Sequence, residues 1–108
     1  MNNTEITYIH RDDNNRKYWF SVVLKGSITE EQKEIIIDCL YDKKYGLFYP
    51  EAVHLPYDRF QGEIFEWMEN SVLPTKKEPT LYMTMDELVE NFQKAKDHWE
   101  YYDIDISR

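Results

Sequence analysis

Alternating apolar and polar residues mark the beginning of the chain as β structure. Residues 5–11 and 17–25 follow the two-residue period of a strand and are rich in β-branched and aromatic side chains. The residues between them include two aspartates and two asparagines, which favour turns. This pattern predicts an N-terminal β-hairpin. Trp19 and Val23 make its second strand apolar on both faces, which predicts a strand that is central or covered on both sides.

A helical period replaces the alternation after the hairpin and predicts a helix over 28–43. Two overlapping capping boxes, beginning at Ser27 and at Thr29, mark its start. Lys43, Lys44 and Gly46 suit its end, because basic side chains and glycine are favoured at helix C-termini. The buried stripe of this helix is expected to consist of Ile28, Gln32, Ile35, Ile36, Cys39 and Leu40.

A second helix is predicted over 84–101. A capping box begins at Thr84, and apolar residues then recur at helical spacing. The positions expected to face inward are Leu88, Phe92, Ala95 and Trp99.

The segment between the helices is less regular. Leu47–Tyr49 favours a short strand. Residues 64–72 fit either a helix face or a strand, and the alternation of Phe65 and Trp67 with glutamates favours the strand. Residues 74–79 begin and end with proline and predict a loop.

These elements together predict one α+β domain over 1–108. Its antiparallel sheet of three or four strands starts with the hairpin and packs against two long helices. A length of 108 residues suits a single core. The apolar fraction of 42% and the aromatic fraction of 16% argue against disorder, although 31% of the residues are charged.

The net charge of −8 is distributed unevenly. Residues 1–26 hold four basic and three acidic residues, so the rest of the chain carries the negative charge. Such a field repels nucleic acid and anionic membranes. We therefore expect a protein partner with a basic or mixed surface, no direct nucleic-acid binding and no membrane association. The sequence shows no secretory signal and no membrane-spanning run, so the cytoplasm is the expected compartment.

No motif of catalysis or of metal or cofactor binding stands out. His10-Arg11-Asp12 is similar to the start of a kinase catalytic loop, but Lys17 occupies the position where that motif needs asparagine. Three glycines are too few for phosphate-binding loops, and the three histidines are not at metal-ligand spacing. Each histidine is expected to be a hydrogen-bonded ring that is exposed or half-buried. The single cysteine, Cys39, excludes an internal disulfide and suits a buried position. We expect no catalytic residues, no cofactor and no metal; an enzyme with a dispersed site is the third alternative.

Four acidic residues stand at four-residue spacing, which places them on one face of the first predicted helix. They are Glu30, Glu34, Asp38 and Asp42. Like charges in this register destabilise a helix by about 0.2–0.5 kcal/mol per pair. The stripe therefore has two interpretations. It is a solvated face that keeps an aromatic-rich protein soluble, or it imitates a phosphate backbone and inhibits a host nuclease or DNA-binding protein.

The C-terminal run from His98 to Asp103 interleaves aromatic and acidic residues. Trp99, Tyr101 and Tyr102 are candidate anchors of a protein interface, because tryptophan and tyrosine are effective at interface centres. In the alternative interpretation, Trp99 and Tyr102 close the core while the acidic residues face water.

Four short motifs follow one another along the chain. They are Tyr8-Ile9-His10-Arg11-Asp12, Gly26-Ser27-Ile28-Thr29-Glu30-Glu31-Gln32, Phe48-Tyr49-Pro50-Glu51-Ala52-Val53-His54-Leu55-Pro56 and Glu78-Pro79-Thr80. The order resembles that of small uncharacterised acidic proteins from phages and mobile elements of gut bacteria. The resemblance covers most of the chain and implies an extended region over 63–72. It implies no site residues, because that group has no assigned activity. The setting it implies is an accessory or host-defence-blocking role, and so a non-catalytic interaction protein.

Overall fold

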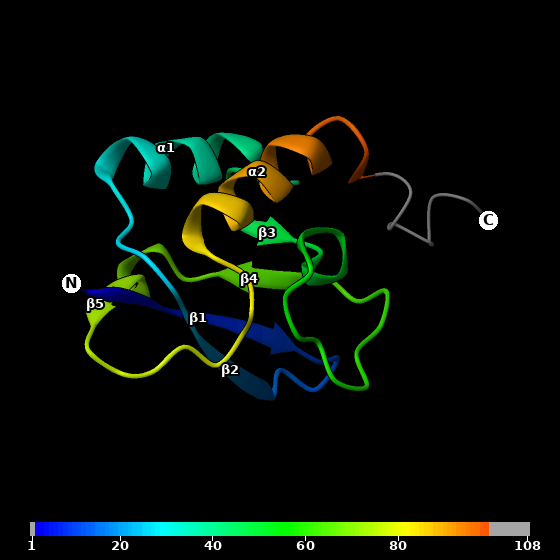
Figure 1. Cartoon of the computed structure of the whole chain (residues 1–108). Helices are drawn as coiled ribbons and strands as arrows, with labels where there is room; N and C mark the ends of the chain where they lie inside the picture. Colours follow the sequence, from blue (N-terminus) through cyan, green and yellow to red (C-terminus); the bar gives the residue numbers. More distant parts are fainter. Residues whose placement is uncertain (1, 100–108) are drawn as a thin grey trace.

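The computed structural model describes residues 2–99 and shows an α+β fold (Figure 1). An antiparallel sheet forms one layer, and two helices lie together on one side of it. In chain order the elements are β1 (Asn3–Arg11), β2 (Lys17–Leu24), α1 (Glu30–Cys39), β3 (Leu47–Phe48), the 3-10 helix η1 (Pro50–Val53), β4 (Phe65–Trp67), the 3-10 helix η2 (Glu69–Ser71), β5 (Leu73–Thr75) and α2 (Met85–Ala95).

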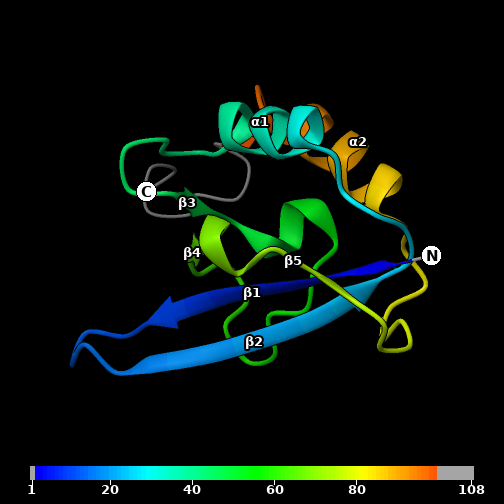
Figure 2. The same cartoon turned by 90° about the vertical axis from the view of Figure 1, so that its left-hand side faces the viewer.

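The predicted hairpin is confirmed as β1 and β2. The strands pair in register from Thr4 opposite Leu24 to Arg11 opposite Lys17. The turn between them is held by the side chain of Asp12, whose Oδ1 accepts hydrogen bonds from the backbone N–H groups of Asn14 and Arg16 at 2.9 Å each. In Figure 2 the turn end of this twisted ribbon extends beyond the helices.

The central strand of the sheet is β1, and not β2 as its apolar faces had suggested. The strand order is β2-β1-β4-β3, and β5 pairs with β1 beside β4. β2 is therefore an edge strand. Trp19 on its outer face is 59% exposed, whereas Val23 is buried beside the segment that contains Thr80. The prediction was a strand that is central or covered on both sides; β2 is not central, and its outward side chains are buried at the Val23 end but not at Trp19.

The 64–72 region is extended only in part. β4 spans Phe65–Trp67, and the side chains of Phe65 and Trp67 are buried in the core. η2 follows β4 directly. The loop predicted over 74–79 begins later than expected, because Pro74 and Thr75 belong to β5. Pro74 fits there as a residue of a short strand that borders no further strand, where a missing N–H is tolerated.

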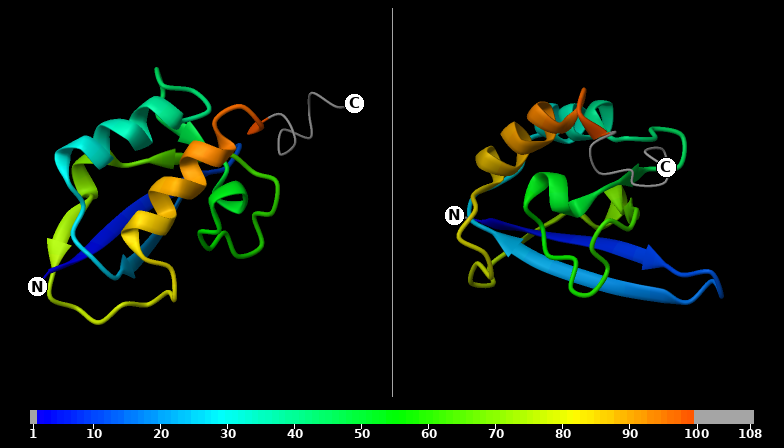
Figure 3. Two further views of the ribbon diagram at one scale, coloured as in Figure 1. Left: turned by 45° about the horizontal axis from the view of Figure 1, so that its top comes forward. Right: turned by 90° about the vertical axis from the view of Figure 1, so that its right-hand side faces the viewer.

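Both predicted helices are present but shorter than expected. α1 begins at the second capping box, where Thr29 and Gln32 bond reciprocally, and not at Ser27. α2 begins at Thr84, where the predicted capping box with Glu87 is formed. The two helices lie side by side in one layer (Figure 3).

Aromatic rings fill the space between the helices and the sheet. Phe48 and Phe65 from neighbouring strands meet Tyr8 of β1, and Phe92 of α2 packs edge-on against Trp67. All five of these side chains are at most 7% exposed. Within residues 2–99, no helix is long and apolar enough to cross a membrane.

Candidate functional site

A groove of about 590 Å³ runs between α1 and the segment that leads from β4 through η2 to Val72. Its floor is apolar and consists of Ile28, Ile37, Trp67 and Val72. Its rim carries polar side chains from both walls: Glu30, Lys33, Glu34, Asp38, Lys43, Glu69 and Asn70. The arrangement follows from local structure, because η2 turns the chain so that Val72 is buried while Glu69 and Asn70 stay exposed.

The structure brings three residues of the acidic stripe to this groove and separates the fourth. Glu30, Glu34 and Asp38 lie on successive turns of α1 and line the rim. Asp42 does not continue the stripe, because α1 ends at Cys39 and Leu40 is extended. The Asp42 side chain instead accepts hydrogen bonds from the backbone N–H groups of Lys44 and Tyr45 in the following turn. The predicted helix end at residue 43 was therefore wrong.

Lysine side chains neutralise much of the remaining stripe. Asp38 accepts from Lys43 Nζ at 2.8 Å and from Lys96 Nζ at 2.7 Å, and Lys33 Nζ lies 3.2 Å from Glu30. These hydrogen bonds from the two lysines lower the pKa of Asp38 from 3.8 to about 2, with their positive charges as the next largest cause. The helical layer is thus acidic but internally paired at this point.

We expect Asp38→Asn to weaken the dependence of the free energy of unfolding on pH under acidic conditions. Because the folded protein lowers the pKa of Asp38, its carboxylate stabilises the fold above the ordinary pKa of 3.8, and this contribution disappears as pH falls through about 2. Urea unfolding of the wild type should therefore lose more stability over this interval than unfolding of the variant. Asp13→Asn, at an exposed residue of the hairpin turn, is the control. Equal acid slopes for wild type and Asp38→Asn would contradict the two lysine contacts.

Two carboxylates of the groove, those of Glu34 and Glu69, are exposed and have no ion-pair partner within residues 2–99. They come from opposite walls, one from α1 and one from η2. Glu34 and Asp38 also border a smaller hollow of about 380 Å³ between α1 and α2. The groove therefore combines apolar contact area with negative charge on both sides.

Among the described residues of the C-terminal aromatic run, Trp99 does not line this groove. Trp99 is 4% exposed and donates a hydrogen bond from its indole N–H to the backbone oxygen of Cys39 at 2.9 Å. For Trp99 this burial agrees with the alternative interpretation, in which its ring closes the core, and not with a surface anchor. Tyr101 and Tyr102 lie outside the described residues.

One feature that the sequence did not indicate is the environment of His10. Its ring is only 4% exposed, stacks on Phe60 at 4.0 Å between ring centroids, and has no hydrogen-bond partner at Nδ1. The expectation of a hydrogen-bonded ring near the surface was therefore wrong for this histidine. The guanidinium of Arg59 lies over the rings of Tyr18 and Phe60 and covers the cluster from outside. Consecutive bulky residues at 8–10 were the available signal that β1 is buried on both faces.

No group of three histidine, cysteine, aspartate or glutamate side chains in the 2–99 range has a geometry suited to a metal ion. No protein-family model, curated protein or solved structure matches the chain.

Proposed function

We propose that this protein is a non-catalytic interaction protein that binds a partner segment in the groove between α1 and η2. The observation that carries the proposal is an apolar floor flanked on both walls by carboxylates that have no ion-pair partner in the described part of the chain. A segment with one or two large apolar side chains and neighbouring lysines or arginines fits this arrangement, because the apolar groups fill the floor and the basic groups meet Glu34 and Glu69. The acidic net charge supports approach of a basic partner.

Binding fits this groove better than catalysis. Acid–base catalysis by carboxyl groups needs at least one of them in a desolvated cleft that raises its pKa. The groove has the opposite arrangement, since its floor is apolar and its carboxylates stand on an exposed rim. The dispersed-site enzyme therefore has no supporting observation.

Imitation of a nucleic acid by the acidic residues of α1 has less support than binding of a peptide in the groove. A phosphate mimic needs a long row of free negative charges. The row on α1 contains three acids, of which Glu30 and Asp38 already have lysine partners. An accessory role in a phage or mobile element is compatible with the peptide groove and stays part of the proposal.

The proposal is tested with two helical peptides of equal length and labelled alike. The first presents leucine and phenylalanine on one face with lysines beside them, and the second has glutamate in place of each lysine. We expect fluorescence anisotropy to detect binding of the lysine peptide only. In the variant Glu34→Lys/Glu69→Lys its affinity should fall about tenfold, which corresponds to about 1.4 kcal/mol.

A charge-matched control is the variant Glu31→Lys/Glu78→Lys. Glu31 lies on α1 but borders the smaller hollow and not the groove, and Glu78 lies in the loop before α2. This control should bind the lysine peptide within about twofold of the wild type. The proposal fails if both double variants weaken binding equally, because the peptide would then respond to net charge alone.

A further inference from the structure

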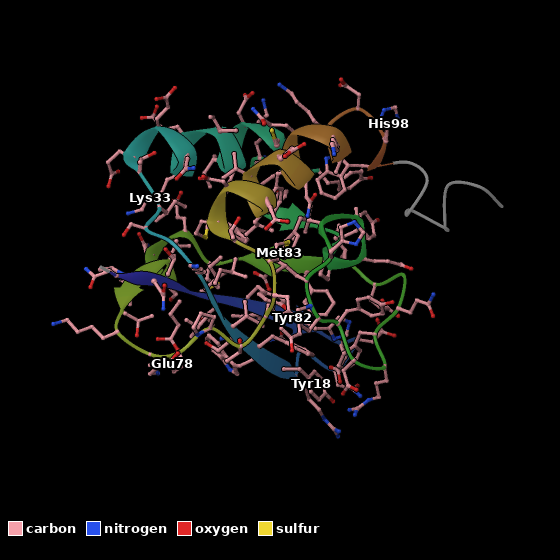
Figure 4. The ribbon with its side chains drawn as sticks, viewed as in Figure 1. Tyr18, Lys33, Glu78, Tyr82, Met83 and His98 are labelled. Carbon is pink, nitrogen blue, oxygen red and sulfur yellow. The ribbon has the colours of Figure 1, made fainter. Side chains whose placement is uncertain are left out.

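We infer that the open edge of β2 is a second binding surface, which accepts an acidic polypeptide segment as an additional antiparallel or parallel strand. This surface is distinct from the groove. Figure 4 shows Tyr18 of β2 at the far side of the molecule from Lys33, which stands on the groove rim. The inference does not depend on the proposed function.

The free hydrogen-bonding groups of β2 belong to alternate residues of the strand. Residues of an edge strand point their N–H and C=O groups alternately toward the neighbouring strand and away from it. Val23 shows which set points away, since its N–H donates to Thr80 Oγ1 at 2.9 Å and its C=O accepts from the Thr80 N–H at 2.8 Å. By this alternation the groups of Lys17, Trp19 and Ser21 also point away from β1. Within residues 2–99 no partner strand or hydrogen bond reaches them.

Only part of the β2 edge is covered by another segment of the chain. The segment around Thr80 bonds to Val23, and Thr84 forms a bridge with Lys25. The covering ends there, so the edge from Lys17 to Ser21 remains open along the border of the sheet farthest from the helices (Figure 3, right). One end of the β2 edge thus already bonds another segment of the chain, and within residues 2–99 the same pattern of donors and acceptors continues unused beyond it.

The side chain of Trp19 lies beside the open N–H and C=O groups of β2. Proteins usually protect a free edge with charged residues, proline or a bulge. Lys17 is one such charge at the end of the free stretch, but Trp19 stands in the middle of it and is 59% exposed. An indole ring in this place adds apolar contact area for the side chains of an incoming strand.

The charge along the β2 edge favours an acidic partner. From Asn14 to Thr29 the chain has three basic residues, Arg16, Lys17 and Lys25, and no acidic residue. Lys17 and Lys25 have no ion pair within residues 2–99. In the sequence this stretch is preceded by Asp12 and Asp13 and followed by Glu30. Arg11 opposite Lys17 is already paired with Glu66 at 2.9 Å. An acidic strand is therefore attracted to this edge. A second copy is disfavoured, because two β2 edges would bring their basic residues together.

The probe is a blocked peptide in which aspartate and valine alternate. We expect it to slow hydrogen exchange of the Lys17, Trp19 and Ser21 amides, measured by NMR, and to change the fluorescence of Trp19. The Tyr18 and Phe20 amides, which face β1, should be unaffected. A peptide with lysine in place of aspartate should bind at least about tenfold more weakly. The aspartate peptide with alternate amides N-methylated should not bind, since it keeps its charge but lacks the backbone donors of one edge.

Matched variants separate the backbone from the side chains. Ser21→Pro removes one outward N–H, whereas Ser21→Ala removes only the hydroxyl that bonds to Thr7. Proline should weaken the aspartate peptide about tenfold, and alanine should leave it unchanged. Lys17→Glu should weaken it several-fold, while Lys94→Glu, the same charge change on α2, should not.

Three results would overturn the inference. The first is equal binding of the aspartate and lysine peptides. The second is concentration-dependent self-association of the wild type that protects the same amides. The third is binding of single-stranded oligothymidylate that changes Trp19 fluorescence without protecting the edge amides.

Discussion

Replacing Trp99 with alanine is expected to lower the free energy of unfolding by about 3–5 kcal/mol. The ring is 4% exposed, lies 6.4 Å from the ring of Phe92 and 6.2 Å from that of Tyr49, and bonds to the Cys39 carbonyl. Alanine removes the apolar area, leaves a cavity and removes the hydrogen bond. Urea unfolding followed by circular dichroism measures the change. Trp99→Phe should cost less, because it keeps most of the packing and loses mainly the indole N–H.

Trp19→Ala is the matched control, since it removes the same side chain from an exposed position. Its effect on stability should stay within about 0.5 kcal/mol. If Trp99→Ala also changes stability by no more than this, Trp99 does not close the core and its role as an interface anchor returns.

The second large effect is expected at alkaline pH. Burial raises the pKa of Tyr8 well above its ordinary value of 10, and its hydroxyl donates to the backbone oxygen of Pro56 at 2.5 Å. Above pH 10 the unfolded chain loses this proton while the folded protein retains it, so stability decreases as pH rises. Tyr8 alone should contribute a loss of up to about 1.4 kcal/mol per pH unit.

Tyr8→Phe should remove this contribution. Near neutral pH the variant is expected to be less stable by about 1 kcal/mol, because the hydrogen bond to Pro56 is lost. Its stability should then fall less steeply above pH 10 than that of the wild type. Tyr45→Phe, at a tyrosine that is 64% exposed, should leave the alkaline slope unchanged. Identical slopes for Tyr8→Phe and the wild type would contradict the buried, protonated hydroxyl.

The candidate groove was only partly visible in the sequence. The helical spacing of Glu30, Glu34 and Asp38 was correct, because neighbours on one helix face are fixed by the helix period alone. Their lysine partners were not visible as such, since Lys96 reaches Asp38 from the end of the other helix. The sequence did not distinguish Glu69 from the other acidic residues, because no local pattern indicates that η2 lies opposite α1.

The sequence by itself determined the hairpin, the capping boxes at Thr29 and Thr84 and the inward face of α2, whereas only Ile36 and Cys39 of the stripe expected on α1 are buried within that helix. These features depend on residues two to four positions apart, and the interactions that form them lie within one element. Tertiary structure decided where α1 ends. Beyond Cys39 the backbone N–H groups of Asp42 and Leu47 each bond to the other residue's carbonyl, and this reversal returns the chain to the sheet as β3.

Tertiary structure also decided the fates of the tryptophans and of the two candidate surfaces. Trp67 is buried and Trp19 is exposed, although both stand in strands. The difference arises because β1 takes the centre of the sheet and leaves β2 at its edge. Burial depends on which distant segments cover a residue, and that is a property of the assembled sheet and helices, not of the local sequence period.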